Sequence, residues 1–181
     1  MPGVEPVQLD ITDTDSVRRA AEVASDVNVL VNNAGTSTRA SLLSGSLDDI
    51  RLEMETHYFG TLNVIRTFAP VIERNGGGAI LNMLSVLSWL HASASGAYSA
   101  AKAAGWAMTD AIRQELAPRG IHVTAVHVGY MDTDMAAFAP ADQKTDPADV
   151  ARLALDGLLA GEAEVLADDL TRATKAHLSG G

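Results

Sequence analysis

The chain alternates between two hydrophobic patterns. Short apolar runs, typical of buried strands, occupy residues 4–9, 27–31, 77–85, 121–128 and 164–167. Longer segments with apolar residues three or four positions apart, typical of helices, occupy residues 16–25, 46–75, 96–116, 146–161 and 168–178. This alternation predicts one α/β domain over residues 1–181, with parallel strands joined by helical crossovers and helices on both faces of the sheet.

In sheets of this kind, ligands bind at the carboxyl ends of the strands. Three polar segments follow predicted strands directly, at residues 32–35 (NNAG), 85–88 and 129–133 (GYMDT). The pattern therefore predicts a ligand site built from these three segments.

The composition narrows the class of protein. The 181 residues suffice for one core, and 47% apolar with 20% charged residues argue against wholesale disorder. The net charge is −10, and Lys and Arg form no basic stripe, which argues against nucleic acid and anionic membranes as partners. There is no cysteine, and the histidines are scattered, so we expect no metal site.

The start of the chain, MPGVEPVQLD, lacks the basic residues and apolar core of a signal peptide. No apolar run approaches the length that spans a membrane. Together with the lack of cysteine, these features favour a soluble, cytoplasmic protein.

The stretch GAYSAAKAAG places Tyr98 and Lys102 four residues apart, on one face of a predicted helix. An ammonium group near a phenol lowers the phenol pKa and prepares it for acid–base catalysis. Ser85, at the end of the preceding strand, is placed to hydrogen-bond a substrate oxygen beside Tyr98. Taken singly, each residue has an ordinary interpretation: a solvated helix face for the pair, and a bond to a loop amide for the serine.

Taken in order, NNAG, Ser85, the YxxxK pair and GYMDT make the sequence similar to the short-chain dehydrogenase/reductase family over nearly its whole length. The resemblance implies a Rossmann-like, doubly wound parallel sheet. It also implies hydride transfer between NAD or NADP and a small carbonyl or alcohol substrate.

The resemblance assigns a role to each matching residue. Tyr98 is the expected proton donor or acceptor, Ser85 polarises the substrate oxygen, and Lys102 lowers the Tyr98 pKa and binds the nicotinamide ribose. The expected cofactor contacts, from adenine to nicotinamide, also include Asp10, Ile11, Asn32, Ala34, Gly35, Met131 and Thr133.

The sequence departs from the family pattern in its cofactor loop. The glycine-rich turn TGxxxGxG, whose amides hold the pyrophosphate, is absent, and residues 4–9 match the third strand of the family. We therefore expect that the first two strands and their helices are missing, that the reading frame opens too late, and that cofactor binding is weak or lost. Residues 27–31 then form an open apolar edge, with residues 4–9 either left unpaired or paired to it.

Three further departures lie near the expected site. His57 stands where the family usually has an Asn that supports a proton relay, and an imidazole can also pass protons. A tolerated helix residue facing a polar cavity is the alternative interpretation. Val128 replaces a usual Pro and Leu84 a frequent Ser, and neither touches a reacting group.

Two functions remain open at this level. The first is an oxidoreductase of this family with Ser85, Tyr98, Lys102 and His57 at its catalytic site. The second is a catalytically silent, shortened protein that works only through its dimerising helices. The family resemblance also implies a homodimer or homotetramer.

Overall fold

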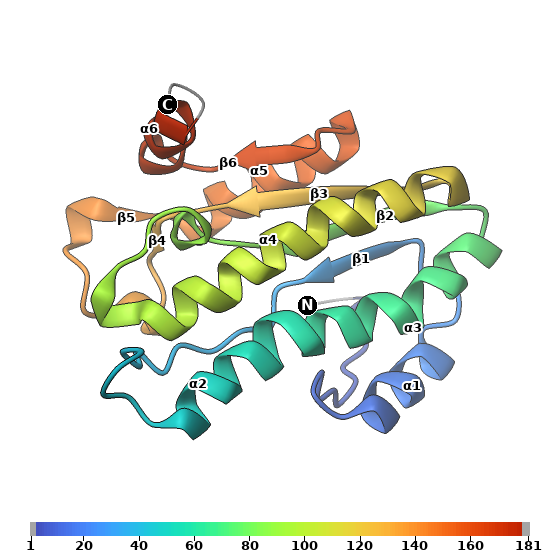
Figure 1. Ribbon diagram of the computed structural model, residues 1–181. Helices are drawn as coiled ribbons and strands as arrows, with labels where there is room; N and C mark the ends of the chain where they lie inside the picture. The colour runs from blue at the N-terminus through green and yellow to red at the C-terminus, as the bar shows by residue number, and fades with distance from the viewer. Residues whose placement is uncertain (1–2, 179–181) are drawn as a thin grey trace.

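The computed structural model describes residues 3–178, which form a four-stranded sheet with helices on both sides and a separate two-stranded sheet (Figure 1). The strands of the main sheet, in spatial order, are β1 (Val29–Asn32), β2 (Gly78–Met83), β3 (Ile121–His127) and β6 (Glu164–Leu166). Each neighbouring pair is parallel. The predicted α/β fold with a parallel sheet is therefore confirmed.

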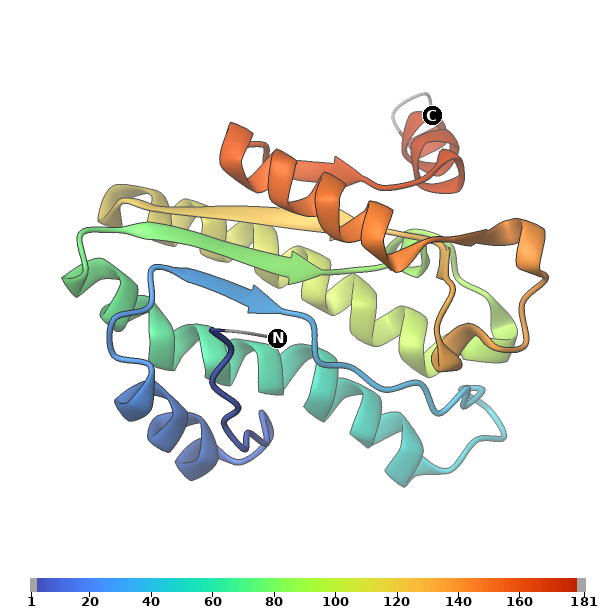
Figure 2. The same cartoon turned by 180° about the vertical axis from the view of Figure 1, so that it is seen from behind.

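Helices cover both faces of this sheet. In chain order they are α1 (Thr14–Val23), α2 (Leu47–Met54), α3 (Thr61–Arg74), α4 (Gly96–Leu116), α5 (Pro147–Ala160) and α6 (Asp169–Leu178). Ile80 of β2 packs with Ile112 of α4, whereas the next residue, Leu81, packs with Leu158 of α5. Successive strand residues point to opposite faces, so α3 and α4 cover one face (Figure 1) and α5 the other (Figure 2).

The strand predicted at residues 4–9 does not form, and this prediction was wrong. Pro6 has no amide hydrogen to give to a ladder, and the Asp10 amide donates to Ser16 Oγ at 3.0 Å instead of to a strand. Strand β1 therefore lies at the edge of the sheet, and Val29 and Val31 are 43% and 48% exposed. The open apolar edge expected from the sequence is confirmed.

The long helix predicted at residues 46–75 contains a wider turn in its middle. The chain is α-helical in α2, π-helical over Glu55–Gly60 and α-helical again in α3. Ser46 caps the start, since its hydroxyl accepts a hydrogen bond from the Asp48 amide. Because π-turns inside helices are rare and are frequent at functional sites, this turn draws attention to His57, which it carries.

The segment after β3 is more ordered than the sequence predicts. Residues between 128 and 146, for which the hydrophobic pattern predicted no strand, contain β4 (Tyr130–Met131), which pairs in parallel with β5 (Lys144–Thr145). Short 3-10 turns complete the connections, at Val86–Ser88, Ser93–Ser95, Ala117–Arg119, Asp134–Ala136 and Ala141–Gln143. Within residues 3–178, no helix has both the length and the apolar character needed to cross a membrane.

Candidate active site

A cavity of about 570 Å³ opens at the carboxyl ends of β2 and β3, beside the start of α4. It collects most of the residues predicted from the sequence: Gly35, His57, Ser85, Tyr98, Lys102, Met131 and Thr133. Its location agrees with the prediction that the ligand site lies where the parallel strands end.

Ser85 lies two residues beyond β2 in a backbone that continues the sheet. The Leu84 amide donates to Val126 O, and the Val86 amide donates to Val128 O. The Ser85 hydroxyl accepts a hydrogen bond from the Leu87 amide at 3.1 Å, so the ordinary role of a serine bound to a loop amide is present. This bond uses only the oxygen, so the hydroxyl hydrogen can still be donated, and in this structure it is directed to Tyr98.

Tyr98 and Lys102 lie in the first two turns of α4, as predicted. Lys102 Nζ donates to the carbonyl oxygen of Met83, the last residue of β2, at 2.9 Å, and lies 5.5 Å from the centroid of the Tyr98 ring. The lysine is thus fixed against the strand that leads to Ser85, and the three side chains converge on one end of the cavity.

The pKa of the phenol differs from the expectation. Burial raises the pKa of Tyr98 to about 12, a hydrogen bond from Ser85 opposes this rise, and the charge of Glu53 adds to it. Burial also lowers the pKa of Lys102 to about 8, against the opposing charge of Glu53. The charge of Lys102 is not among the causes of the Tyr98 shift, and loss of hydration is the largest of them. Tyr98 is a neutral phenol, the form that donates a proton.

A carboxylate that sequence reasoning missed lies behind the site. Glu53 is completely buried, and its Oε1 accepts hydrogen bonds from the Thr38 amide (2.6 Å) and hydroxyl (2.8 Å). Its Oε2 lies 3.3 Å from His57 Nε2. Burial raises the pKa of the Glu53 carboxyl, but the nearby His57 ring and the bonds from Thr38 outweigh it and lower the pKa overall. The signal in the sequence was an acid four residues before His57 on one helix.

His57 is oriented by its ring nitrogen Nε2. This nitrogen donates to Thr36 O at 2.8 Å, so it carries the hydrogen when the ring is neutral and Nδ1 is the basic atom. The ring meets Tyr98 edge to face, with the centroids 5.1 Å apart. A Cβ on Gly35 would approach His57 Cε1 to 2.8 Å, so this glycine of NNAG leaves room for the imidazole.

His127, a second residue that the sequence did not single out, contacts the backbone of Ser85. His127 Nδ1 donates to the Ser85 carbonyl oxygen at 3.3 Å, and its ring stacks on Trp89 with the centroids 3.9 Å apart. Burial lowers the pKa of His127 to about 4, so the ring is neutral near pH 7. Sequence spacing does not reveal this contact, which joins residues 42 positions apart.

Two of the predicted cofactor contacts lie outside the main cavity. Asn32 and Ala34 line a smaller neighbouring space together with Lys102. The Asn32 amide donates to Asn82 Oδ1 at 2.8 Å, and Asn82 in turn donates to Thr109 Oγ1 at 3.0 Å. Asn32 therefore joins β1 to β2 and to α4 in this structure.

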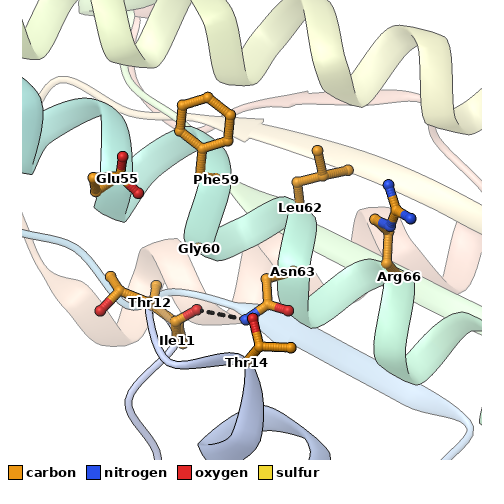
Figure 3. A pocket seen from close by; sticks show the side chains of 9 residues that line it. All are labelled: Ile11, Thr12, Thr14, Glu55, Phe59, Gly60, Leu62, Asn63 and Arg66. Atoms are coloured by element: carbon orange, nitrogen blue, oxygen red, sulfur yellow. Dashed lines mark hydrogen bonds between the residues drawn. The ribbon is translucent and has the colours of Figure 1, made fainter.

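Asp10 and Ile11 lie at a different place again. Ile11 lines a separate cavity of about 320 Å³ between the loop before α1 and the π-turn, where its carbonyl oxygen accepts from Asn63 Nδ2 (Figure 3). Asp10 is exposed, and its carboxylate accepts from the Thr12 amide and hydroxyl, which lowers the Asp10 pKa. The structure therefore does not bring these two residues together with Ser85, Tyr98 and Lys102.

The family model of short chain dehydrogenases matches residues 2–144. A solved short chain dehydrogenase from Burkholderia cenocepacia J2315, in complex with NADP, is 37% identical to this chain with a TM-score of 0.94. That similarity covers 99% of this chain and 75% of the Burkholderia chain.

Curated relatives are similar over a shorter range. Dehydrogenase/reductase SDR family member 7B of Xenopus laevis is 34% identical over 134 residues, which are 72% of this chain and 42% of that protein. NADPH-dependent 1-acyldihydroxyacetone phosphate reductase of Schizosaccharomyces pombe is 31% identical over 136 residues, which are 72% of this chain and 46% of that protein. The chain therefore spans less than half the length of these two relatives.

Proposed function

This chain belongs to the short-chain dehydrogenase family, and we propose that it carries the catalytic residues of an NAD(P)-dependent oxidoreductase acting on a small carbonyl or alcohol. The observation that carries this proposal is the convergence of Ser85, Tyr98 and Lys102 in one cavity at the carboxyl ends of the strands. The NADP in the similar Burkholderia structure and the NADPH in the name of the yeast relative support a nicotinamide cofactor.

In the proposed reduction, the Ser85 hydroxyl donates a hydrogen bond to the substrate carbonyl oxygen. The Tyr98 phenol donates its proton to the same oxygen as the carbonyl carbon receives a hydride. A phenol with a pKa of about 12 is protonated near pH 7, which suits the donor in this direction. In the reverse direction the Tyr98 phenolate, left after the phenol has given up its proton, receives the proton of the alcohol, while Ser85 keeps its hydrogen bond to the same oxygen.

The lining of the cavity fits the nicotinamide end of the cofactor, which supplies or accepts the hydride when it is bound. The Lys102 ammonium and the Thr133 hydroxyl are donors suited to ribose hydroxyls and a carboxamide, and Met131 and Gly35 complete the wall. No segment of the sequence has the TGxxxGxG pattern that holds a pyrophosphate. Weak cofactor binding therefore remains part of the proposal.

We assign proton resupply to the pair of His57 and Glu53. Nε2 of His57 donates to Thr36 O and lies beside the Glu53 carboxylate, which leaves Nδ1 as the nitrogen without a hydrogen in the neutral ring. The T-shaped contact between His57 and Tyr98 supports this role, because it places the imidazole against the group that loses a proton. Glu53 also favours the charged form of Lys102.

A homodimer or homotetramer is the proposed assembly. The outer face of α4 exposes small residues, Ala100, Ala107 and Ala111, and Phe59 on the adjacent π-turn is 51% exposed. Small residues allow close approach of helices, so this face suits a second copy of the chain. A cytoplasmic location remains a prediction from the composition.

Transfer of deuterium tests the proposed reaction. The chain is incubated with a saturating concentration of NADPH deuterated at the transferable position and a panel of aldehydes and ketones, and the alcohols are analysed by mass spectrometry. We expect deuterium on the carbinol carbon with the wild-type chain and much less with Ser85→Ala. A folded chain that transfers none to any carbonyl would contradict the proposal and favour the catalytically silent alternative.

A further inference from the structure

The catalytic cavity differs in charge from the rest of the chain. In the whole sequence, 23 acidic residues outnumber 13 Lys and Arg residues. The described residues that line the cavity nevertheless include no Asp or Glu, while their basic side chains are Arg39, His57, His91 and Lys102. A lining of this kind favours a ligand that carries negative charge.

Three acidic groups near this lining are already hydrogen-bonded or paired, and a fourth, Asp134, is exposed between Thr133 and Met135 and does not line the cavity. Glu53 accepts from Thr38 and lies next to His57. Asp168 accepts hydrogen bonds from the amides of Gly129 and Thr171, and Asp132 pairs with a lysine outside the cavity, Lys144, at 3.2 Å. None of these bonds involves Arg39, which forms no ion pair within residues 3–178.

The backbone at Arg39 is fixed in an unusual conformation. Its φ of 56° lies in the left-handed region, and among the described non-glycine residues no other φ is positive. The residues on both sides are anchored: Thr38 bonds to buried Glu53, and the carbonyl oxygen of buried Ala40 accepts from the Ala97 amide at 3.2 Å. A strained residue that its neighbours hold in place is often a functional one, because the fold maintains its direction.

The side chain of Arg39 lines the cavity and contacts the segment after β4. Its guanidinium carbon lies 4.3 Å from the centroid of the Phe138 ring, which in turn meets Tyr130 edge to face. Stacking on an aromatic ring leaves the N–H groups at the edge of the guanidinium free to donate. The same lining also contributes apolar surface from Leu87 and Met135.

We propose that Arg39 binds an anionic group of the substrate, so that the enzyme acts on carbonyl compounds that carry a carboxylate or a phosphate as well as an apolar part. The planar guanidinium matches both anions through two parallel hydrogen bonds. The part of this inference that concerns catalysis rests on the proposed oxidoreductase function. The part that concerns binding does not, and it is tested separately.

Equilibrium binding of matched probes tests the inference without any need for turnover. Levulinate is compared with methyl levulinate, and dihydroxyacetone phosphate with dihydroxyacetone, by isothermal titration calorimetry of the full 181-residue chain. We expect the anion of at least one pair to bind roughly 10- to 100-fold more tightly than its neutral partner, the range given by charged hydrogen bonds. The pair that shows the difference identifies a carboxylate or a phosphate as the preferred anion.

Variants at position 39 assign the preference to one side chain. Arg39→Gln and Arg39→Gly should both abolish the preference for the anion, and Arg39→Gly also relieves the left-handed strain. Arg39→Lys should keep part of the preference. Arg74→Gln, an exposed arginine on α3 that lines no part of this cavity, should keep all of it. Circular dichroism checks that each variant is folded.

Equal binding of anion and neutral partner in both pairs overturns the inference, as does a preference that survives in folded Arg39→Gln. An Arg39-dependent preference in a chain that transfers no hydride supports the anion site while the proposed reaction fails. Hydride transfer without any preference for anions supports the proposed reaction and overturns the anion site. The two proposals can therefore fail independently.

Discussion

Nε2 of His57 lies 3.3 Å from Oε2 of Glu53, and both side chains are almost completely buried, at 2% and 0% exposure. The pair occupies consecutive turns of the helical segment that faces Tyr98 and Lys102. Each of those two catalytic candidates has a pKa that the charge of Glu53 raises. Glu53, which is not part of the YxxxK motif, therefore influences the protonation of Tyr98 and Lys102, which are.

Replacing this acid by its neutral isostere, Glu53→Gln, should destabilise the fold at neutral pH by about 2 kcal/mol, because hydrogen bonds to a charged group are lost. The folded state holds the Glu53 pKa below its usual 4.5, so the carboxylate contributes stability above that pH and loses it as the pH falls through the lowered pKa. Urea unfolding should therefore show a smaller loss of stability on acidification in Glu53→Gln than in the wild type.

Glu55→Gln is the matched control for this experiment, since Glu55 is exposed on the same helical segment. It should unfold at nearly the wild-type urea concentration at each pH. If both variants behave alike, the buried carboxylate does not have the stabilising role assigned to it.

Loss of the phenol in Tyr98→Phe should lower the rate of deuterium transfer roughly 100- to 10,000-fold, the usual contribution of a general acid. The fold should be unchanged, because the ring and its contact with His57 remain. The control is Tyr58→Phe, which removes a hydroxyl from the adjacent π-turn without touching the cavity. Equal rates in the two variants would remove Tyr98 from the proposed mechanism.

The relative positions of neighbouring site residues were predictable, because their spacing along a helix or strand determines them. Tyr98 and Lys102 share a helix face through their spacing of four residues, and Ser85 follows a strand whose end the apolar pattern marks. The parallel order of the main sheet also followed from the alternation of strands and helices.

The remaining features depend on contacts between distant segments. Residues 4–9 have a strand-like sequence, but they do not pair with the open edge of β1, and the Asp10 amide that follows them donates to Ser16 Oγ instead. The raised pKa of Tyr98 comes from burial, which spacing does not reveal. The bond from His127 to the Ser85 carbonyl and the left-handed turn at Arg39 are likewise set by tertiary packing.

The burial of His127 predicts a loss of stability in mild acid. Its pKa falls from 6.5 to about 4 on folding, so the unfolded chain binds the proton more readily between these values. The free energy of unfolding should therefore decrease as the pH falls through this window, by up to about 3 kcal/mol from this residue, since one pKa unit is 1.36 kcal/mol.

His127→Gln retains an N–H donor for the Ser85 carbonyl but does not titrate in this window. Urea unfolding of this variant across the window should show a shallower dependence on pH than the wild type. The exposed His177→Gln serves as the control and should keep the full dependence. An unchanged slope in His127→Gln would show that the buried imidazole is not its source.

Binding of cofactor fragments tests which part of the cofactor site the chain contains. The residues proposed to hold the nicotinamide end, Tyr98, Lys102 and Thr133, line one cavity, whereas Ile11 lies in a separate cavity and the sequence has no glycine-rich turn. Reduced nicotinamide mononucleotide should therefore bind the chain nearly as well as NADPH does, and both should bind weakly, because the pyrophosphate gains no helix amino end.

The measurement is a fluorescence titration of the reduced nicotinamide ring with the wild-type chain and with Lys102→Met as the control for specific binding. We expect both ligands to require roughly millimolar concentrations, about −4 kcal/mol of binding free energy, and to bind still more weakly to Lys102→Met. Micromolar affinity for NADPH together with weak binding of the mononucleotide would contradict this prediction. It would show that other groups of the chain hold the pyrophosphate, a function that neither its sequence pattern nor the catalytic cavity indicates.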